Sequence, residues 1–251
     1  MQDAIAEKLA AIEEKEQVTI LYAAESGSRA WGFASPDSDY DVRFLYVRPL
    51  EFYLKLEKTR DVIEWQLDDV FDINGWDIQK AFRLLYSSNP TLFEWARSPI
   101  VYRRAPQWET ISREMDRCFQ KKAGLYHYLN TARRTYQDHI CRDNVPLKKY
   151  FYALRPILAA RWILDHGTPP PILFTELADA ELDPALRDCV DQLLEEKKSA
   201  PESWKGHGIG VLDEYIVSQM AEIKRQSDAL PPDPKPGWES LDRLFLSLLA
   251  D

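Results

Sequence analysis

Apolar positions near the start of the chain follow two different periods. In residues 3–16, Ile5, Leu9 and Ile12 recur at helical spacing among Glu and Lys residues, which predicts an amphipathic helix. Residues 18–24 are apolar and rich in β-branched side chains without a break, which predicts a buried strand. The chain therefore opens with a helix followed by a strand.

The same pattern continues as far as about residue 105. A turn rich in Pro, Ser and Asp leads into residues 39–47, where a second strand is expected, and a third strand is expected within 61–73. Helical spacing resumes after Asp77, which is suited to cap that helix. Strands alternate with helices here, which predicts an α/β unit.

Beyond residue 105 the strand signals fade and helical spacing dominates. The ranges in which helices are expected are 107–140, 147–166, 176–198, 210–229 and 238–249. We therefore expect an α/β (α+β) chain with a mixed-sheet domain over residues 1–105 and an all-helical domain over residues 106–251.

Composition narrows the class of protein. The 251 residues carry 41 acidic and 32 basic side chains, a net charge of -9 that disfavours a protein coating duplex nucleic acid. The three cysteines are widely spaced without a CxxC pair, which disfavours a disulfide framework or a structural zinc site. No apolar run reaches the ~18–20 residues that a membrane helix needs, and no signal sequence is recognised, so we expect a cytoplasmic protein without membrane partners.

Two features that can carry chemistry lie within fifteen residues of each other. A Gly27-Ser28 turn follows the first strand, and Asp39 and Asp41 open the next one. Because strand side chains alternate, Asp39 and Asp41 project from the same face, and Arg43 shares it. Two adjacent carboxylates favour a divalent cation with hard oxygen ligands, Mg²⁺ above all, while the turn offers backbone N–H groups to phosphate oxygens.

Each feature alone has an ordinary structural explanation, but their order is specific. The stretch over residues 27–43 reads Gly-Ser-Arg-Ala-Trp-Gly-Phe-Ala-Ser-Pro-Asp-Ser-Asp-Tyr-Asp-Val-Arg. It resembles the nucleotidyltransferase superfamily with the DNA polymerase β type of fold. It looks more similar still to the branch of predicted nucleotidyltransferases related to YcgL and RlaP, which is associated with RNA repair. Further similarities to that branch lie at residues 74–80, 88–90, 94–95 and 148–156.

The resemblance implies a fold, a reaction and a set of site residues. It implies a nucleotidyltransferase-type mixed sheet with flanking helices, a two-ion Mg²⁺ site and a nucleoside triphosphate as substrate. In that mechanism Asp39 and Asp41 bind the metal ions, and a third acid binds one metal and activates the acceptor hydroxyl. The residues of the motif expected at the nucleotide are Gly27, Ser28, Arg29 and Ser38.

The third acid is found by pattern. Asp72 lies between Phe71 and Ile73, as expected for an acid on a strand, and is preferred for both catalysis and metal binding. Asp77 is the alternative, although it also fits a helix cap. Asp68 and the neighbouring Asp69 fit a turn better than a site.

A basic and aromatic group near residue 150 is a second candidate contact for the triphosphate. Lys148, Tyr152 and Arg155 share one face of the expected helix, and Lys149 lies beside them. Lys149, Tyr152 and Arg155 are therefore expected near the nucleotide. The competing interpretation is an amphipathic helix with Tyr152 in the core. Arg29 and Arg43 are further candidates for phosphate contacts.

The expected function is transfer of a nucleoside monophosphate from a nucleoside triphosphate to a hydroxyl acceptor, with an RNA end or a protein among the candidate acceptors. One alternative is adenylylation of a protein or small molecule, and another is a non-catalytic nucleotide-binding module. Acceptor identity, base preference, use of a template and oligomeric state stay open at this point.

Overall fold

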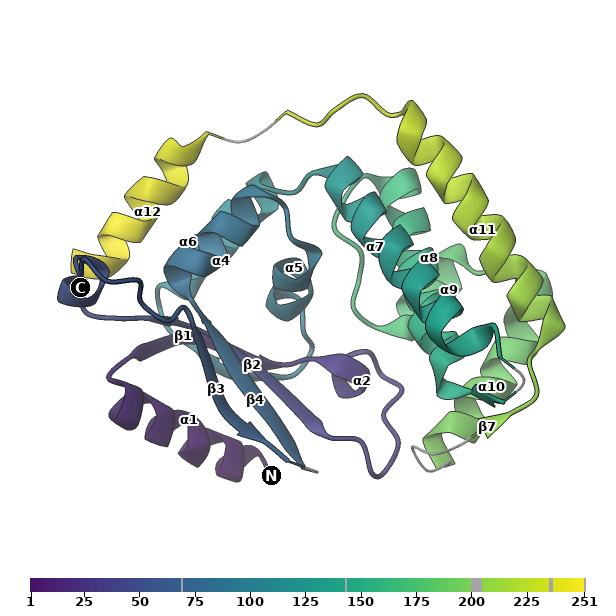
Figure 1. Ribbon diagram of the computed structural model, residues 1–251, viewed down its shortest axis with the longest axis horizontal. Coiled ribbons are helices and arrows are strands. Elements are labelled where there is room, and N and C mark those ends of the chain that lie inside the picture. The colour runs from purple at the N-terminus through teal and green to yellow at the C-terminus, as the bar shows by residue number, and fades with distance from the viewer. Residues whose placement is uncertain (69, 143, 200–204, 235–236, 251) are drawn as a thin grey trace. The chain divides into compact units, whose positions relative to one another are not determined.

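The chain forms two compact units. The structure, a computed structural model, describes residues 1–68, 70–142, 144–199, 205–234 and 237–250 (Figure 1). The first unit comprises Met1–Ala30, Asp39–Phe119 and the described part of Lys235–Asp251. The second comprises Trp31–Ser38 and Gln120–Pro234. This division differs from the expected one at residue 105, because a short early segment belongs to the second unit and the C-terminal segment belongs to the first.

The first unit is built on a five-stranded sheet with the order β3-β4-β2-β1-β5. The strands are β1 (Thr19–Glu25), β2 (Tyr40–Val47), β3 (Val62–Leu67), β4 (Phe71–Asp77) and β5 (Val101–Arg104). Strands β2 and β4 pair in parallel, and every other neighbouring pair is antiparallel. The expected mixed α/β fold is thus confirmed.

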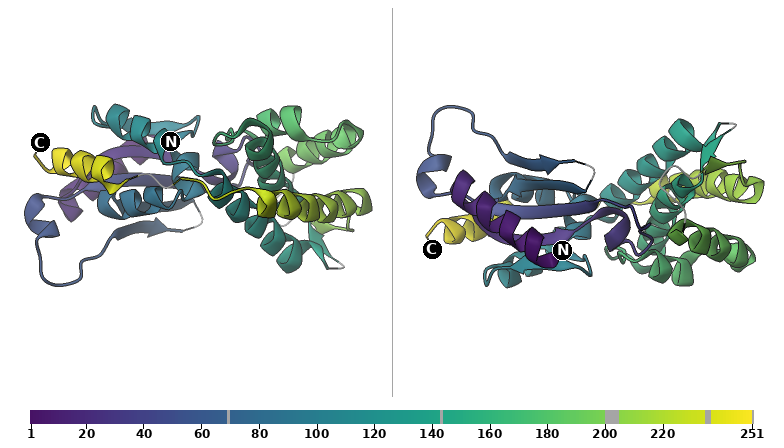
Figure 2. Two further views of the ribbon diagram at one scale, coloured as in Figure 1. Left: turned by 90° about the horizontal axis from the view of Figure 1, so that it is seen from above. Right: turned by 90° about the horizontal axis from the view of Figure 1, so that it is seen from below.

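Helix α1 (Gln2–Glu16) covers one face of this sheet, as Figure 2 shows in purple in the view from below. The apolar residues at helical spacing, Ile5, Leu9 and Ile12, are buried against side chains of the sheet that include Val42 and Phe44. Burial of these apolar side chains fixes which residues of β2 face α1, and therefore which residues face the opposite side.

The opposite face carries the larger core. It is covered by α4 (Ile78–Tyr86), α5 (Pro90–Ala96), α6 (Trp108–Arg117) and α12 (Trp238–Ala250). Tyr22 of β1 stacks on Trp108 of α6 with ring centroids 3.8 Å apart. The short helices α2 (Gly27–Ala30) and α3 (Leu50–Tyr53) follow β1 and β2, respectively.

The second unit is helical, as expected for the C-terminal part of the chain. Its helices are α7 (Lys121–Thr135) with the π-turn η1 (Tyr136–Ile140), α8 (Lys148–His166), α9 (Phe174–Glu181), the 3-10 turn η2 (Pro184–Leu186), α10 (Arg187–Ser199) and α11 (Gly210–Ala229). The unit also contains two short antiparallel strands, β6 (Val145–Pro146) and β7 (Lys205–Gly206). Within the described ranges, no helix has the length and apolarity needed to cross a membrane.

Segment 31–38 is built into the second unit by aromatic packing. Phe33 is fully buried, and its ring lies 5.3 Å from that of Phe151 and 5.9 Å from that of Phe174. The backbone N–H of Phe174 also donates to the Trp31 carbonyl. The chain thus leaves the first unit after α2 and returns to it at Asp39, immediately before β2.

Candidate active site

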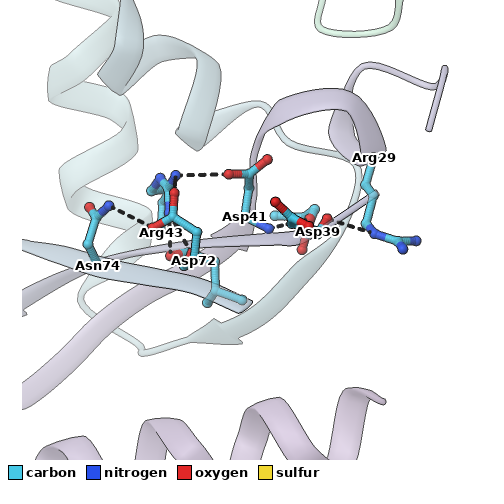
Figure 3. Close-up of polar contacts among 8 residues, drawn as sticks. Arg29, Asp39, Asp41, Arg43, Asp72 and Asn74 are labelled. Carbon is cyan, nitrogen blue, oxygen red and sulfur yellow. Dashed lines mark hydrogen bonds and ion pairs between the residues drawn. The ribbon is translucent and has the colours of Figure 1, made fainter. Parts of the chain in front are cut away.

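Two carboxylates lie side by side on the central parallel strands. Asp41 of β2 is directly opposite Asp72 of β4 in the parallel register. Their neighbours Val42 and Ile73 are buried on the α1 face of the sheet, so Asp41 and Asp72 project from the other face. Figure 3 shows both side chains reaching toward the same point, with Asp39 beside Asp41.

Arg43 lies between these two carboxylates. Its Nη2 donates to Asp41 Oδ1 at 2.9 Å and to Asp72 Oδ2 at 2.6 Å. The Arg43 side chain is 14% exposed, and those of Asp41 and Asp72 are 28% and 30% exposed, so the three charges are only partly hydrated. The expected parity of Asp41 and Arg43 on β2 is therefore seen in the structure.

Gly27 touches the Asp41 carboxylate. A Cβ atom built on Gly27 would lie 1.9 Å from Asp41 Oδ2, and the glycine has φ +60°. Ser26, just before it, donates its backbone N–H to the Asp41 carbonyl at 2.8 Å. The Gly27-Ser28 turn and the acidic strand are thus in direct contact, and a side chain at position 27 would have no room.

Glu25 is hydrogen-bonded to the backbone of Asp41. It is 1% exposed, and its Oε1 accepts the backbone N–H of Asp41 at 2.9 Å while its Oε2 accepts the Tyr102 hydroxyl. Burial raises the pKa of Glu25. Sequence reasoning missed both residues. For Glu25 a signal existed, since an acid ends an otherwise apolar strand, whereas Tyr102 belongs to a short strand without a recognisable pattern.

The electrostatics of Asp41 show how closely the acids are grouped. Burial raises the pKa of Asp41, the guanidinium of Arg43 lowers it, and the nearby carboxylates of Asp72 and Asp39 raise it further. Asp39 is exposed at the entry to β2. Its carbonyl accepts a hydrogen bond from Arg29 Nε at 3.0 Å, and the Arg29 guanidinium lies 3.8 Å from the centroid of the Tyr40 ring. The result is a cluster of carboxylates in which Arg43 is bonded to Asp41 and Asp72, and Arg29 also lowers the pKa of Asp41.

The alternative third acids lie elsewhere. Asp77 is five residues beyond Asp72 on β4, which corresponds to roughly 17 Å along a strand. It caps α4 by accepting the Gln79 N–H. Asp68 accepts the backbone N–H groups of Val70 and Phe71 in the turn between β3 and β4. Asp69 lies outside the described residues.

The carboxylate oxygens of Asp41 and Asp72 are ligands of the kind that a divalent cation needs. Among the residues that the structure describes, no group of three or more His, Cys, Asp or Glu side chains is close enough to hold a metal ion. The two carboxylates nevertheless converge on one cation, Arg43, and Asp41 Oδ2 and Asp72 Oδ1 are not bonded to it. Hard oxygen atoms arranged around a cation fit Mg²⁺.

The remaining predicted residues have other surroundings. Ser28 is buried in α2. Ser38 belongs to the second unit, where its hydroxyl accepts the Ser35 N–H at 3.0 Å. There too, Lys149 lies 4.8 Å from the ring centroid of Tyr152, and burial lowers the pKa of Lys149.

Tyr152 and Arg155 pack onto the early segment of the second unit. The Tyr152 ring lies 5.5 Å from that of Trp31, and the two rings are nearly perpendicular. Arg155 is 4% exposed and lies 4.5 Å from the centroid of the Trp31 ring. Both contacts fit the competing interpretation of a packed helix face, and contact of these residues with a triphosphate stays a prediction.

Comparison with known proteins agrees with the resemblance carried by residues 27–43. The protein is 42% identical over 253 residues to the uncharacterized protein YcgL of Bacillus subtilis (strain 168), a match that covers 100% of this chain and 97% of that protein. A solved nucleotidyltransferase-like protein from Exiguobacterium sibiricum aligns over 98% of this chain and 80% of its own, with 13% identity and a TM-score of 0.33, too low to inform on fold or function. The protein-family model RlaP, described as the RNA repair pathway DNA polymerase beta family, matches residues 1–247. The chain therefore belongs to the RNA repair pathway DNA polymerase beta family.

Proposed function

We propose that this protein is a metal-dependent nucleotidyltransferase that moves a nucleoside monophosphate from a nucleoside triphosphate to a hydroxyl group. The observation that carries the proposal is the contact between Gly27 and the Asp41 carboxylate, with Asp72 opposite Asp41 on the next strand. This arrangement joins a turn suited to phosphate and a pair of carboxylates suited to metal in one place. Membership of a polymerase β family supports the same reaction class.

The residues assigned to the metal are Asp39, Asp41 and Asp72. Divalent ions bound there would neutralise the charge of the triphosphate and of the pyrophosphate that leaves when the nucleoside monophosphate is transferred. Asp72 is the third acid because it is opposite Asp41, whereas Asp77 is at the far end of β4. Asp39 is exposed, which suits a carboxylate that meets an incoming nucleotide and its metal.

The chain's own groups hold and orient the reactants. Gly27 begins α2, whose first backbone N–H groups are offered to phosphate oxygens. Glu25 fixes the backbone of Asp41 and thereby the place of its carboxylate. Arg43 holds Oδ2 of Asp72, whereas Oδ1 accepts only a long hydrogen bond, 3.5 Å, from Asn74 Nδ2, so Oδ1 is the oxygen that we assign to take the proton of the acceptor hydroxyl. Positioning of this kind provides much of the rate in phosphoryl and nucleotidyl transfer.

An RNA end is our first choice of acceptor. The family description names an RNA repair pathway, and an RNA 3′ end presents the hydroxyl that the reaction requires. The charge of -9 does not oppose this choice, because gripping one end needs few phosphate contacts.

Transfer of labelled nucleotide tests the proposal. Each of the four α-³²P-labelled nucleoside triphosphates is incubated with Mg²⁺ and a panel of RNA, protein and small hydroxyl acceptors. Asp39→Asn and Asp41→Asn are expected to lose transfer while remaining folded. Asp61→Asn, which alters an exposed carboxylate paired with Lys80 in the same unit, is expected to keep it.

The panel also separates the alternatives. Label on a protein or small molecule, and none on RNA, would show that the acceptor is not RNA, while the proposed reaction would stand. Tight nucleotide binding without transfer to any member would favour a non-catalytic nucleotide-binding module. Full transfer by Asp41→Asn would refute the assigned site.

A further inference from the structure

We propose that Arg43 is a built-in countercation: it holds the Asp41 and Asp72 carboxylates together before a divalent ion arrives and weakens their affinity for that ion. This inference rests on the proposed function, since it concerns the same carboxylates. It goes beyond that function because it assigns a role to a residue that is neither a metal ligand nor a phosphate ligand.

The hydrogen bonds of Arg43 leave no N–H group of its two terminal nitrogens for a phosphate. Nη2 donates to Asp41 Oδ1 and to Asp72 Oδ2, and Nη1 donates to the carbonyls of Asp72 at 2.6 Å and of Val42 at 3.2 Å. A guanidinium has four N–H groups on its two terminal nitrogens. All four therefore have acceptors within the sheet, and the earlier expectation of a phosphate contact finds no support in this arrangement.

The same hydrogen bonds fix the guanidinium in place. Two of the acceptors are backbone carbonyls of β2 and β4, which are part of the sheet and do not depend on a metal ion. The Arg43 side chain is 14% exposed, so its charge is only partly screened by water. Arg43 thus stays beside the carboxylates as a fixed cation and does not behave as a mobile surface side chain.

The position of this cation has two electrostatic consequences. Without a metal ion, Asp41 and Asp72 repel each other, and Arg43 offsets that repulsion because it lies between them. With a metal ion, Arg43 repels the ion, since both are positive and both face the same pair of carboxylates. Removing the charge of Arg43 must therefore destabilise the metal-free protein and strengthen metal binding.

Calorimetric titration with Mg²⁺ alone tests this directly. Arg43→Gln keeps a polar side chain without the charge, and it is expected to bind Mg²⁺ about tenfold more tightly than the wild-type protein. The matched control is Arg60→Gln, which removes an exposed arginine paired with Glu64 in the same unit and is expected to leave the affinity unchanged. Equal or weaker binding by Arg43→Gln would overturn the proposal.

Thermal unfolding supplies a second readout. Without Mg²⁺, Arg43→Gln is expected to unfold at a lower temperature than Arg60→Gln, and saturating Mg²⁺ is expected to remove most of that difference. Arg43→Lys keeps the charge without the four hydrogen bonds, so its Mg²⁺ affinity is expected to stay near that of the wild type. Metal-free stability of Arg43→Gln equal to that of the control would overturn the proposal.

Two further results keep the outcomes apart. Should Arg43→Gln not fold, ¹⁵N NMR of the arginine side chains in the wild-type protein replaces it: the Arg43 signals are expected to shift on Mg²⁺ addition while those of Arg60 do not, and unshifted Arg43 signals would overturn the inference. Absence of Mg²⁺ binding by the wild type itself would instead refute the metal site of the proposed function.

Discussion

Gly27 meets two demands that no other residue type satisfies together. Its backbone has φ +60°, and a Cβ atom there would lie 1.9 Å from Asp41 Oδ2. We predict that Gly27→Ala lowers the free energy of unfolding by about 1–2 kcal/mol through the left-handed backbone alone. Displacement of the Asp41 carboxylate is expected to abolish nucleotide transfer as well.

Urea unfolding and the transfer assay check this prediction together. Gly210→Ala is the control, because a Cβ at Gly210 meets nothing within 4 Å. We expect that control to match or exceed wild-type stability, since alanine favours a helix over glycine. Wild-type stability and transfer in Gly27→Ala would contradict the close contact.

The third acid is tested by a pair of substitutions on β4. Asp72→Asn is expected to lose transfer with little change in stability, because asparagine keeps the size of the side chain and an oxygen that can accept from Arg43. Asp77→Ala is expected to keep transfer and to lose about 1–2 kcal/mol of stability with its helix cap. Circular dichroism with denaturant and the transfer assay measure both effects, and the reverse result would move the assignment to Asp77.

The residues of the candidate site differed in how far the sequence revealed them. Gly27, Asp39 and Asp41 fall in a motif with fixed spacing, and Asp72 follows from strand alternation. Arg43 contacts both carboxylates only because β2 pairs with β4. Arg43 and Asp72 are 29 positions apart in the sequence, and no local pattern predicts that pairing. Glu25 and Tyr102 meet for the same reason, through a pairing of distant strands.

The contribution of Asp77, the N-cap residue of helix α4, to the stability of the protein depends on pH. Asp77 accepts the Gln79 N–H at 2.8 Å and the Tyr53 hydroxyl at 3.0 Å, and burial raises its pKa above the ordinary 3.8. The folded protein therefore binds this proton more tightly than the unfolded chain does. Acidification through the raised pKa must stabilise the wild type relative to a variant that lacks the carboxyl group.

We accordingly predict that the stability gap between wild type and Asp77→Ala widens as the pH falls from neutrality toward 3.8. Urea unfolding at a series of pH values measures that gap. A gap that narrows over this range would show that Asp77 is not held in the buried environment described here.

Whole elements were predicted well where periodicity extends over many residues. Helices α1, α8, α11 and α12 lie close to their expected ranges, because amphipathic spacing repeats several times in each. Strand β5 was not expected, since four residues with exposed ends carry no alternation. The zone 61–73 proved to hold β3 and only the first residues of the antiparallel strand β4, which continues to Asp77. The expected helix over 107–140 ends at Arg117 and resumes at Lys121.

The whole chain is interleaved in a way that local patterns do not reveal. Its last helix, α12, belongs to the first unit, where Leu241 is 1% exposed in the core shared with α4 and α6. Phe33 is buried in the second unit although it lies in sequence between the Gly27-Ser28 turn and Asp39. Hydrophobic periodicity states that a face is buried, but it does not state against which element.

This membership leads to a prediction about α12. Leu241→Ala is expected to destabilise the first unit by about 2–5 kcal/mol, because it leaves a cavity in that core. Leu246→Ala in the same helix, where the side chain is 63% exposed, is the control and is expected to cost little. Hydrogen exchange should accelerate in α4 and α6 and not in α7 or α8. A change in hydrogen exchange that is the same in all four helices would contradict the assignment of α12 to the first unit.

The central claim is that the acids at the head of β2 and β4 bind a metal together with a nucleotide at the Gly27 turn. Its most direct test is calorimetric binding of a non-hydrolysable nucleoside triphosphate, with and without Mg²⁺, to wild type and to Asp41→Asn. We predict Mg²⁺-dependent binding by the wild type and none by the variant. Nucleotide binding that is independent of Mg²⁺, or that Asp41→Asn retains, would contradict it.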